Sequence, residues 1–167
     1  MKISLLCPSR ERLNKFITFT SSVFATCKDI DNIELVLGVD SDDSKKESYK
    51  RIANNLSFNQ MATECTGDLV AMVGDDMIFQ TIDWDEKIIE AFKSKQDNIY
   101  LVHCNDGMRG PGNKYVNVPP LAVNSFVHKD YINTVGRYVQ TEIKEIFQDT
   151  FLDRLFSSIK RKIYYHD

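Results

Sequence analysis

The stretch Asp68-Leu-Val-Ala-Met-Val-Gly-Asp-Asp-Met-Ile-Phe79 decides the fold. Its apolar run, Leu69 to Val73, has the length of a buried strand and ends abruptly in Gly74-Asp75-Asp76. Two adjacent carboxylates at the carboxyl end of a buried strand repel each other, and burial penalises their charge unless something positive lies beside them. A divalent cation held by oxygen ligands, often completed by a substrate phosphate, meets that need. Gly-Asp-Asp also suits a solvated turn, so this stretch alone leaves both interpretations open.

The composition is that of one soluble globular domain. The chain has 167 residues, of which 43% are hydrophobic and 27% charged, and this length is enough for one sizeable core. Because 21 basic residues face 24 acidic ones, the net charge is -3. The charge balance therefore gives no reason to expect nucleic acid or an anionic membrane as a partner.

The cysteine pattern favours a reducing compartment. The four cysteines show neither a C-x-x-C motif nor the density of a disulfide framework, and no ligand-like spacing predicts zinc. The sequence offers neither a signal peptide nor a run long enough to span a membrane. We therefore expect a cytoplasmic protein. The cysteines are Cys7, Cys27, Cys65 and Cys104.

Apolar periodicity divides the chain into alternating strands and helices. This alternation predicts a three-layer α/β/α sandwich with a mainly parallel sheet. Gly67 is expected to cap the carboxyl end of the helix predicted over 58–65. Strands are predicted at 2–6, 33–39, 69–73, 99–104, 121–127 and 162–165, and helices at 11–27, 45–56, 58–65, 86–93, 130–135 and 142–159.

Three polar segments directly follow predicted strands. They are Pro8-Ser9-Arg10, Asp40 to Asp43, and Gly74 to Asp76. In a parallel sheet, ligands bind outside the carboxyl ends of the strands, where such loops converge. We therefore expect the three segments to meet at one edge of the sheet, and this favours a functional site over a plain turn.

These residues resemble the nucleotide-sugar glycosyltransferases of the GT-A fold, in particular the family 2-like branch. The likeness lies in the order of a strand ending in Pro8-Ser9-Arg10, a second ending in Val39-Asp40, and an acidic pair after a third. Gly74-Asp75-Asp76-Met77 followed by Trp84-Asp85 is similar to small, often phage-encoded members, and a phage-encoded chain would act in the cytoplasm of the host cell. Gln148-Asp149-Thr150 resembles the late acidic motif that supplies the base in inverting members. Each motif is short, and the resemblance rests on their order and spacing along the chain.

The resemblance implies a role for each matching residue. Asp76, with Asp75, would hold Mn²⁺ or Mg²⁺ together with the diphosphate of the donor. Asp40 would accept a hydrogen bond from the nucleotide base, and Pro8 to Arg10 would line the nucleotide pocket. Asp149 would take the proton of the acceptor hydroxyl. Each has a simpler alternative, because Asp40 also suits a helix cap, Arg10 a surface ion pair and Asp149 an exposed helix position.

The third metal ligand is the point at which the sequence departs from the family. Members commonly supply a late histidine after a further strand, whereas this chain ends at Asp167, directly after His166. Either His166 serves, or the ligand and its strand are missing, and we expect the second. The resemblance also implies one domain truncated at its carboxyl end, with a nucleotide-binding part over about 1–104 and an acceptor-side part over about 105–167.

Three functions are compatible with these observations. The first is a metal-dependent glycosyltransferase that moves a sugar from a nucleotide-diphosphate donor to an unknown acceptor. The second is a GT-A-like module that binds a nucleotide or nucleotide sugar without transferring sugar. The third is an interaction domain with no ligand, in which the carboxylates merely end a strand.

Overall fold

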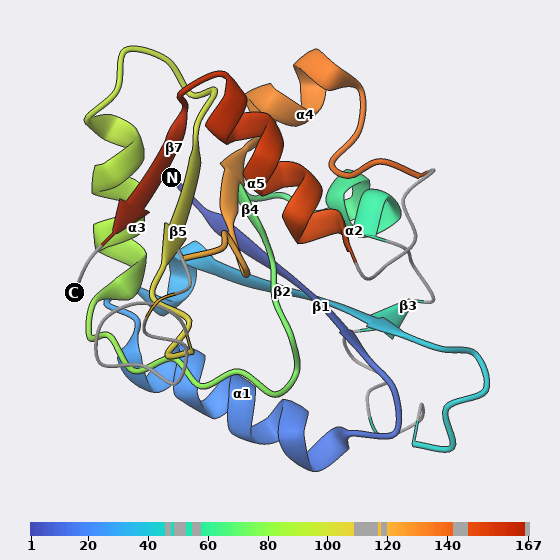
Figure 1. Ribbon diagram of the computed structural model, residues 1–167. Coiled ribbons are helices and arrows are strands. Elements are labelled where there is room, and N and C mark those ends of the chain that lie inside the picture. Colours follow the sequence, from blue (N-terminus) through green and yellow to red (C-terminus); the bar gives the residue numbers. More distant parts are fainter. Residues whose placement is uncertain are drawn as a thin grey trace.

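The computed structural model describes residues 1–45, 48, 53–54, 58–108, 117, 120–141 and 147–165. Within these ranges the strands form one seven-stranded sheet in the order β3-β2-β1-β4-β6-β5-β7 (Figure 1). β1 and β4 lie at its centre, so the stretch from Asp68 to Phe79 contributes a central strand, β4. The strands are β1 (Ile3–Ser9), β2 (Ile33–Val39), β3 (Ala53–Asn54), β4 (Leu69–Met72), β5 (Leu101–Cys104), β6 (Phe126–His128) and β7 (Lys162–Tyr165).

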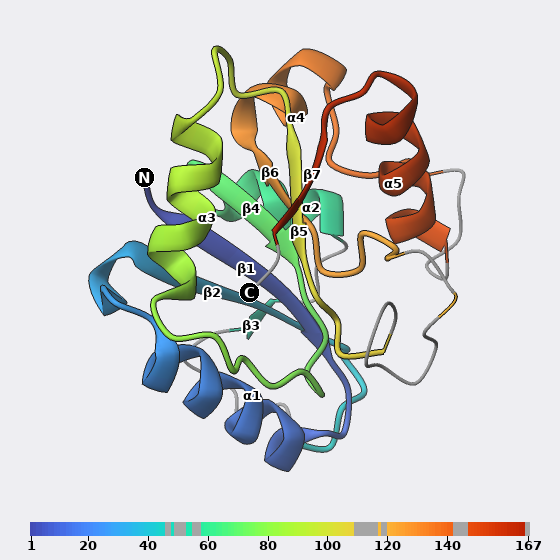
Figure 2. The same ribbon diagram turned by 60° about the vertical axis from the view of Figure 1, so that its left-hand side comes forward.

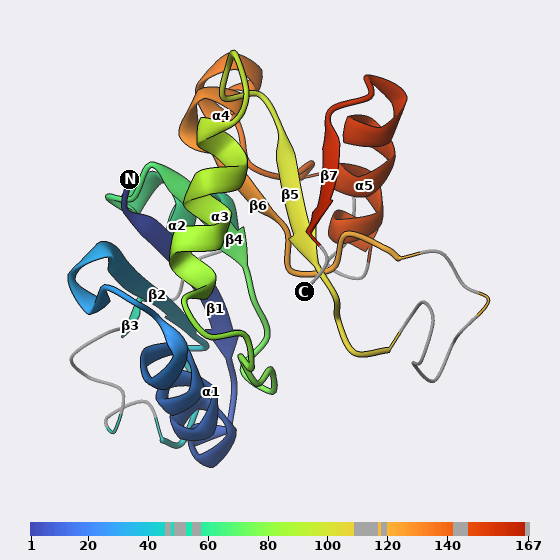
Figure 3. The same cartoon turned by 90° about the vertical axis from the view of Figure 1, so that its left-hand side faces the viewer.

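Helices cover both faces of the sheet and create two apolar cores, as the sequence predicts (Figures 2 and 3). α1 and α3 pack on one face, whereas α2, α4 and α5 pack on the other. Successive strand residues serve opposite faces, so Leu5 belongs to the first core and Leu6 to the second. The helices are α1 (Leu13–Thr26), α2 (Phe58–Glu64), α3 (Trp84–Lys93), α4 (Lys129–Val135) and α5 (Gln148–Ser158), with a 3₁₀ turn at Ile30–Asn32.

The sheet is mainly parallel, as predicted, but β6 runs against its neighbours. β1 pairs in parallel with both β2 and β4, and β7 pairs in parallel with β5. β6 lies between β4 and β5 and is antiparallel to both. The carboxyl ends of β1, β2, β4 and β5 therefore lie at one edge of the sheet, which is the edge where the predicted site belongs.

Three of the predicted elements differ from those in the structure. The strand predicted over 2–6 continues to Ser9, so Pro8 and Ser9 belong to β1 rather than to the loop after it. The strand predicted over 121–127 is wrong in its first half, because Asn124 has a φ of 56° and Ala122 donates its amide to the Asp153 carboxylate. The helix predicted over 45–56 is wrong at Ala53 and Asn54, which form β3, and most of its other residues lie outside the described ranges. The first five residues of the helix predicted over 142–159 also lie outside them.

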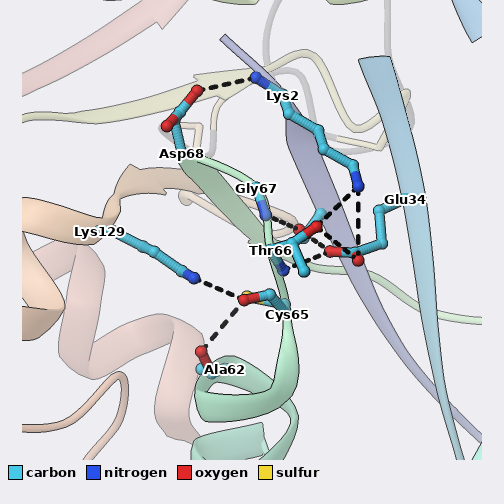
Figure 4. A network of polar contacts seen from close by, with 9 residues as sticks. Lys2, Glu34, Ala62, Cys65, Thr66, Gly67, Asp68 and Lys129 are labelled. Carbon is cyan, nitrogen blue, oxygen red and sulfur yellow. Dashed lines mark hydrogen bonds and ion pairs between the residues drawn. The ribbon is translucent and has the colours of Figure 1, made fainter. Parts of the chain in front are cut away.

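A polar network ties β1, β2 and the start of β4 together at the opposite, amino edge of the sheet (Figure 4). The buried Ser4 hydroxyl donates to the Glu34 carboxylate and accepts the Gly67 amide at 2.9 Å. Burial opposes the charge of Glu34, but hydrogen bonds from Ser4 and Thr66 lower its pKa. The prediction that Gly67 caps a helix is wrong, because its φ is not positive and α2 ends at Glu64. Gly67 is needed because β1 passes so close to it.

None of the helices within the described ranges is long and apolar enough to cross a membrane.

Candidate functional site

The first carboxylate of the pair, Asp75, is a buried anchor between two loops. Its side chain is only 4% exposed. One oxygen accepts a hydrogen bond of 2.7 Å from the hydroxyl of Ser9, the last residue of β1, and the other accepts one of 3.1 Å from the guanidinium of Arg12. Both oxygens are therefore satisfied, and the ends of β1 and β4 are joined as the sequence predicts.

The second carboxylate, Asp76, faces outward. Its side chain is 55% exposed and lies 3.6 Å from Arg12 and 3.7 Å from Lys15, both measured from nitrogen to the same oxygen. These distances exceed those of hydrogen bonds, so the contacts are ion pairs across a partly solvated gap. Asp76 is thus the carboxylate that remains accessible to a ligand.

The end of β2 contributes a second acidic loop to the same edge. Arg10 approaches Asp40 at 3.4 Å and donates to Asp42 at 2.7 Å. All three side chains are well exposed, so a ligand could replace these ion pairs at little cost. The structure thus brings Pro8 to Arg10, Asp40 and the carboxylate pair to one edge of the sheet, where the sequence places them.

Asp43 links the loop after β2 to the segment between β1 and α1. Its carboxylate is buried and accepts the backbone amides of Glu11 at 2.8 Å and Lys45 at 2.7 Å. The Glu11 carboxylate in turn accepts the amide and the hydroxyl of Ser44, and Glu11 itself has a φ of 55°. The segment that carries Arg10 and Arg12 is therefore fixed by hydrogen bonds between carboxylates of one loop and backbone amides of the other, rather than by regular secondary structure.

The charge of the carboxylate pair reaches the core beneath it. Burial raises the pKa of the Cys7 thiol, and the charges of Asp75 and Asp76 raise it further. The hydrogen bond to Asp75 likewise raises the pKa of the Arg12 guanidinium. Cys7 therefore stays a neutral thiol in the apolar core.

The late acidic residue, Asp149, lies in the first turn of α5. One of its oxygens accepts the Thr150 amide at 2.6 Å and the Thr150 hydroxyl at 3.3 Å. Because α5 leads back to the start of β7, which pairs in parallel with β5, its first turn points toward the carboxyl edge of the sheet. Among the described contacts, none joins Asp149 to Asp75 or Asp76. His166 lies outside the described residues.

Sequence reasoning missed Arg12 and the anchoring role of Asp43. The need for a cation beside the acidic pair was recognised, and Arg12 is the second basic residue after β1, so charge alone could have pointed to it. Asp43 could be found only from the fold, because its amide partners belong to two different loops. Of the pair Trp84-Asp85, which contributes to the resemblance, Asp85 has a structural role. Its buried carboxylate accepts the backbone amides of Lys28 and Asp29.

The donor set of the carboxylate pair fits a hard divalent cation. Carboxylate oxygens are the ligands that Mg²⁺ and Mn²⁺ prefer, and Mg²⁺ sites commonly use one or two carboxylates with substrate phosphates. Asp76 would provide the accessible oxygens and Asp75 the fixed background charge. Within the described ranges, no group of three His, Cys, Asp or Glu side chains converges on one point. A cation here would therefore need oxygens from a ligand.

Searches with protein-family models and against curated protein sequences find no match to the chain. Solved structures do match. TarS 1–349 of S. aureus in complex with UDP superposes with a TM-score of 0.74 at 13% identity, over 100% of this chain and 58% of that one. Mannosyltransferase PcManGT from Pyrobaculum calidifontis, in complex with GDP-Man and Mn²⁺, superposes with a TM-score of 0.74 at 10% identity, over 99% of this chain and 55% of that one.

A third match is glucosyl-3-phosphoglycerate synthase from Mycobacterium tuberculosis in complex with UDP. It superposes with a TM-score of 0.63 at 13% identity and covers 99% of this chain and 69% of its own. This chain therefore spans somewhat more than half the length of the TarS and PcManGT chains. At these identities the likeness concerns the fold, and it agrees with the resemblance seen in the sequence. The chain has the fold of the GT-A-type glycosyltransferases.

Proposed function

We propose that this chain is a metal-dependent glycosyltransferase that moves a sugar from a nucleotide-diphosphate donor to an acceptor. The observation that carries the proposal is the edge where β1, β2 and β4 end. There, the hydrogen bond between Ser9 and Asp75 joins two loops and leaves Asp76 accessible. The fold supports the proposal, because matching structures are complexes with UDP, with UDP-GlcNAc, and with GDP-Man and Mn²⁺.

Each residue of the edge has a task in such a transfer. Asp40 would accept from the nucleotide base once Arg10 moves aside, and their exposed ion pair offers little resistance. Asp76 would hold the cation against the donor's diphosphate, whereas Asp75 keeps the loop in place. A bound Mn²⁺ or Mg²⁺ would neutralise charge on the departing nucleoside diphosphate. Asp149 would accept the proton of the acceptor hydroxyl.

The test is release of nucleoside diphosphate from UDP-, GDP- and CDP-linked sugars with Mn²⁺ present. Asp76→Asn should lower the rate by about 100-fold or more, because it removes the charged oxygen that holds the cation. Asp31→Asn is the matched control, since Asp31 is exposed on the 3₁₀ turn before β2, at the other edge of the sheet. No release from any donor, or equal rates for the two variants, would reject the proposal.

A nucleotide-binding module without transfer is the second candidate. Its support is that the Asp149 carboxylate already accepts the amide and the hydroxyl of Thr150 within the first turn of α5, as a structural aspartate does. Because none of the described contacts joins Asp149 to Asp75 or Asp76, a nucleotide could bind beside the carboxylate pair without it. Calorimetry with UDP, GDP and CDP plus Mn²⁺ separates the candidates, because binding without turnover favours the module.

A further inference from the structure

The carboxylate pair is balanced by two cations from the start of α1. Arg12 precedes the helix and contacts both Asp75 and Asp76, whereas Lys15 lies in its first turn and faces Asp76 alone. Two negative and two positive side chains thus face each other, and their formal charges cancel. The turn after β4 supplies the two carboxylates, and the segment at the start of α1, earlier in the chain, supplies the two cations.

The two cations are not held equally. Arg12 is fixed through its hydrogen bond to the buried Asp75 carboxylate. Lys15 has only the 3.7 Å approach to Asp76, and both side chains are 55% exposed. Exposed pairs of this kind contribute little free energy, so Lys15 can leave Asp76 at small cost.

Lys15 also has room to move. A hollow of about 340 Å³ opens between α1 and the turn after β4, with Lys15 and Asp76 both in its wall. The lining combines polar side chains of α1 with the residues that follow the acidic pair. They are Asn14, Lys15, Thr18, Asp76, Met77 and Ile78.

We propose that Lys15 exchanges between Asp76 and the donor diphosphate, and that Arg12 and Lys15 thereby couple metal binding to nucleotide binding. This inference rests on the proposed function. Without ligands, Lys15 occupies the carboxylate that the metal needs. A divalent cation at Asp76 repels the ammonium, which is then free for phosphate oxygens.

Charge balance predicts that metal binding and nucleotide binding strengthen each other. The four side chains sum to zero, so a divalent cation alone leaves an excess of positive charge. A nucleotide sugar brings about one negative charge per phosphate, which removes that excess. Neither ligand alone balances the site, but the two together do, and each therefore binds more tightly when the other is present.

Removing the Lys15 charge then has opposite effects on the two ligands. Lys15→Gln frees Asp76 from a competing cation, so Mn²⁺ alone binds more tightly. The same change removes a cation that attracts phosphate, so UDP alone binds more weakly. From the modest strength of exposed pairs we expect shifts of roughly two- to fivefold in each dissociation constant. A general loss of folding would weaken both ligands and could not produce opposite signs.

The experiment is isothermal titration of the full chain with Mn²⁺ alone, with UDP or GDP alone, and with the nucleotide at saturating Mn²⁺. The wild type, Lys15→Gln and Lys93→Gln are compared. Lys93 is the matched control because it is an exposed lysine in the last turn of α3, which leads to the amino end of β5. Thermal melting in the absence of ligand verifies that both variants fold.

The expected result is opposite shifts in Lys15→Gln, unchanged constants in Lys93→Gln, and tighter nucleotide binding by the wild type when Mn²⁺ is present. Suppose that the wild type binds nucleotide, but Lys15→Gln has the same dissociation constants, or both constants shift in the same direction. The exchange of Lys15 is then overturned, and the proposed function survives. If the wild type binds neither nucleotide under any condition, both are overturned.

Discussion

At the scale of the residue, the two adjacent carboxylates have different roles in the candidate site. Asp75 is buried and both its oxygens have partners, so it fixes the loop after β4 to the end of β1. Asp76 is exposed and loosely paired, so it can exchange partners. The sequence presents the two as equivalent, and only their burial separates a structural role from a chemical one.

Ser9→Ala tests the anchoring role of Asp75. The substitution removes the 2.7 Å hydrogen bond and leaves a buried carboxylate oxygen without that donor. Because an unsatisfied buried group keeps its full desolvation cost, we expect the free energy of unfolding to fall by about 1 to 3 kcal/mol. Urea denaturation followed by circular dichroism measures this change.

The matched control is Ser21→Ala. The Ser21 hydroxyl donates to the Ile17 carbonyl within α1 and is exposed, so its loss should change stability by less than about 0.5 kcal/mol. Equal effects at the two serines would mean that the link between Ser9 and Asp75 contributes nothing beyond an ordinary surface hydrogen bond.

His103, on β5, makes the stability depend on pH. It is 1% exposed, and within the described residues neither ring nitrogen has a hydrogen-bond partner. Burial and the charge of Lys162 lower its pKa from 6.5 to about 4, although Asp153 and Asp106 act in the opposite direction. Between these two values the unfolded chain binds a proton that the folded chain does not. The stabilisation is therefore complete above pH 6.5 and is lost as the pH falls toward 4.

Replacing His103 by leucine should remove this pH dependence. The side chain would still pack beside the Tyr164 ring, whose centroid lies 4.9 Å from that of His103, but it could not titrate. Across the window we expect the wild type to lose about 3 kcal/mol more than the variant, from 1.36 kcal/mol per pKa unit. Urea denaturation at pH 4 to 7 measures both chains. Parallel curves would show that His103 does not titrate in this range.

At the scale of the element, the spacing of β1 and β4 depends on a glycine. A Cβ at Gly67 would lie 2.4 Å from the Ser4 hydroxyl, 2.8 Å from the Ser4 nitrogen and 2.9 Å from the Lys2 carbonyl oxygen. Two of these atoms are backbone, so no rotamer relieves the clash. We expect Gly67→Ala to destabilise the fold by about 1 to 3 kcal/mol, as measured by urea denaturation.

The double variant Ser4→Ala with Gly67→Ala identifies the cause. It removes the hydroxyl but keeps both backbone contacts, so the stability of the Gly67→Ala chain should not recover. Recovery would show that the glycine serves only the side-chain network of Figure 4. Gly136, by contrast, ends α4 with a φ of 80° and open space around it, so its requirement is conformational.

The sequence predicts those elements whose apolar pattern is set by one contact surface. β2, β4 and α1 fall where periodicity places them, because each faces a core on one or both sides, whereas β1 begins as predicted and extends three residues further. Gly67 was misassigned because a glycine after a helix resembles a cap, whereas its cause is a contact with a strand more than 60 residues away. No local pattern contains such a contact.

The candidate site was predictable to a similar extent. Loops that follow parallel strands must meet, so the approach of Ser9 to Asp75 follows from the fold class. Charge makes Arg12 a candidate cation, but its contact with the acids, and that of Lys15, depends on how α1 lies beside the turn after β4. The direction of β6 was equally hidden, since three residues carry no signal of orientation.

At the scale of the whole molecule, the strand order makes the two parts of the chain interdependent. The expected nucleotide-binding part, about 1–104, includes β4 and β5, which do not pair with each other. β6 lies between them, and β7 covers the other side of β5. Both come from the acceptor-side part. Without that part, β5 would have no partner strand among those described.

We therefore expect the chain to unfold as one cooperative unit. Trp84 of α3 packs against Phe126 of β6, with ring centroids 6.1 Å apart, so its fluorescence reports contact between the two parts. Urea curves from Trp84 fluorescence and from far-ultraviolet circular dichroism should coincide in midpoint and slope. A fragment covering 1–104 should show weaker cooperativity, because β5 has lost both neighbours. Two separate transitions in the full chain, or a fragment with the slope expected for its length, would instead mean that the nucleotide-binding part folds alone.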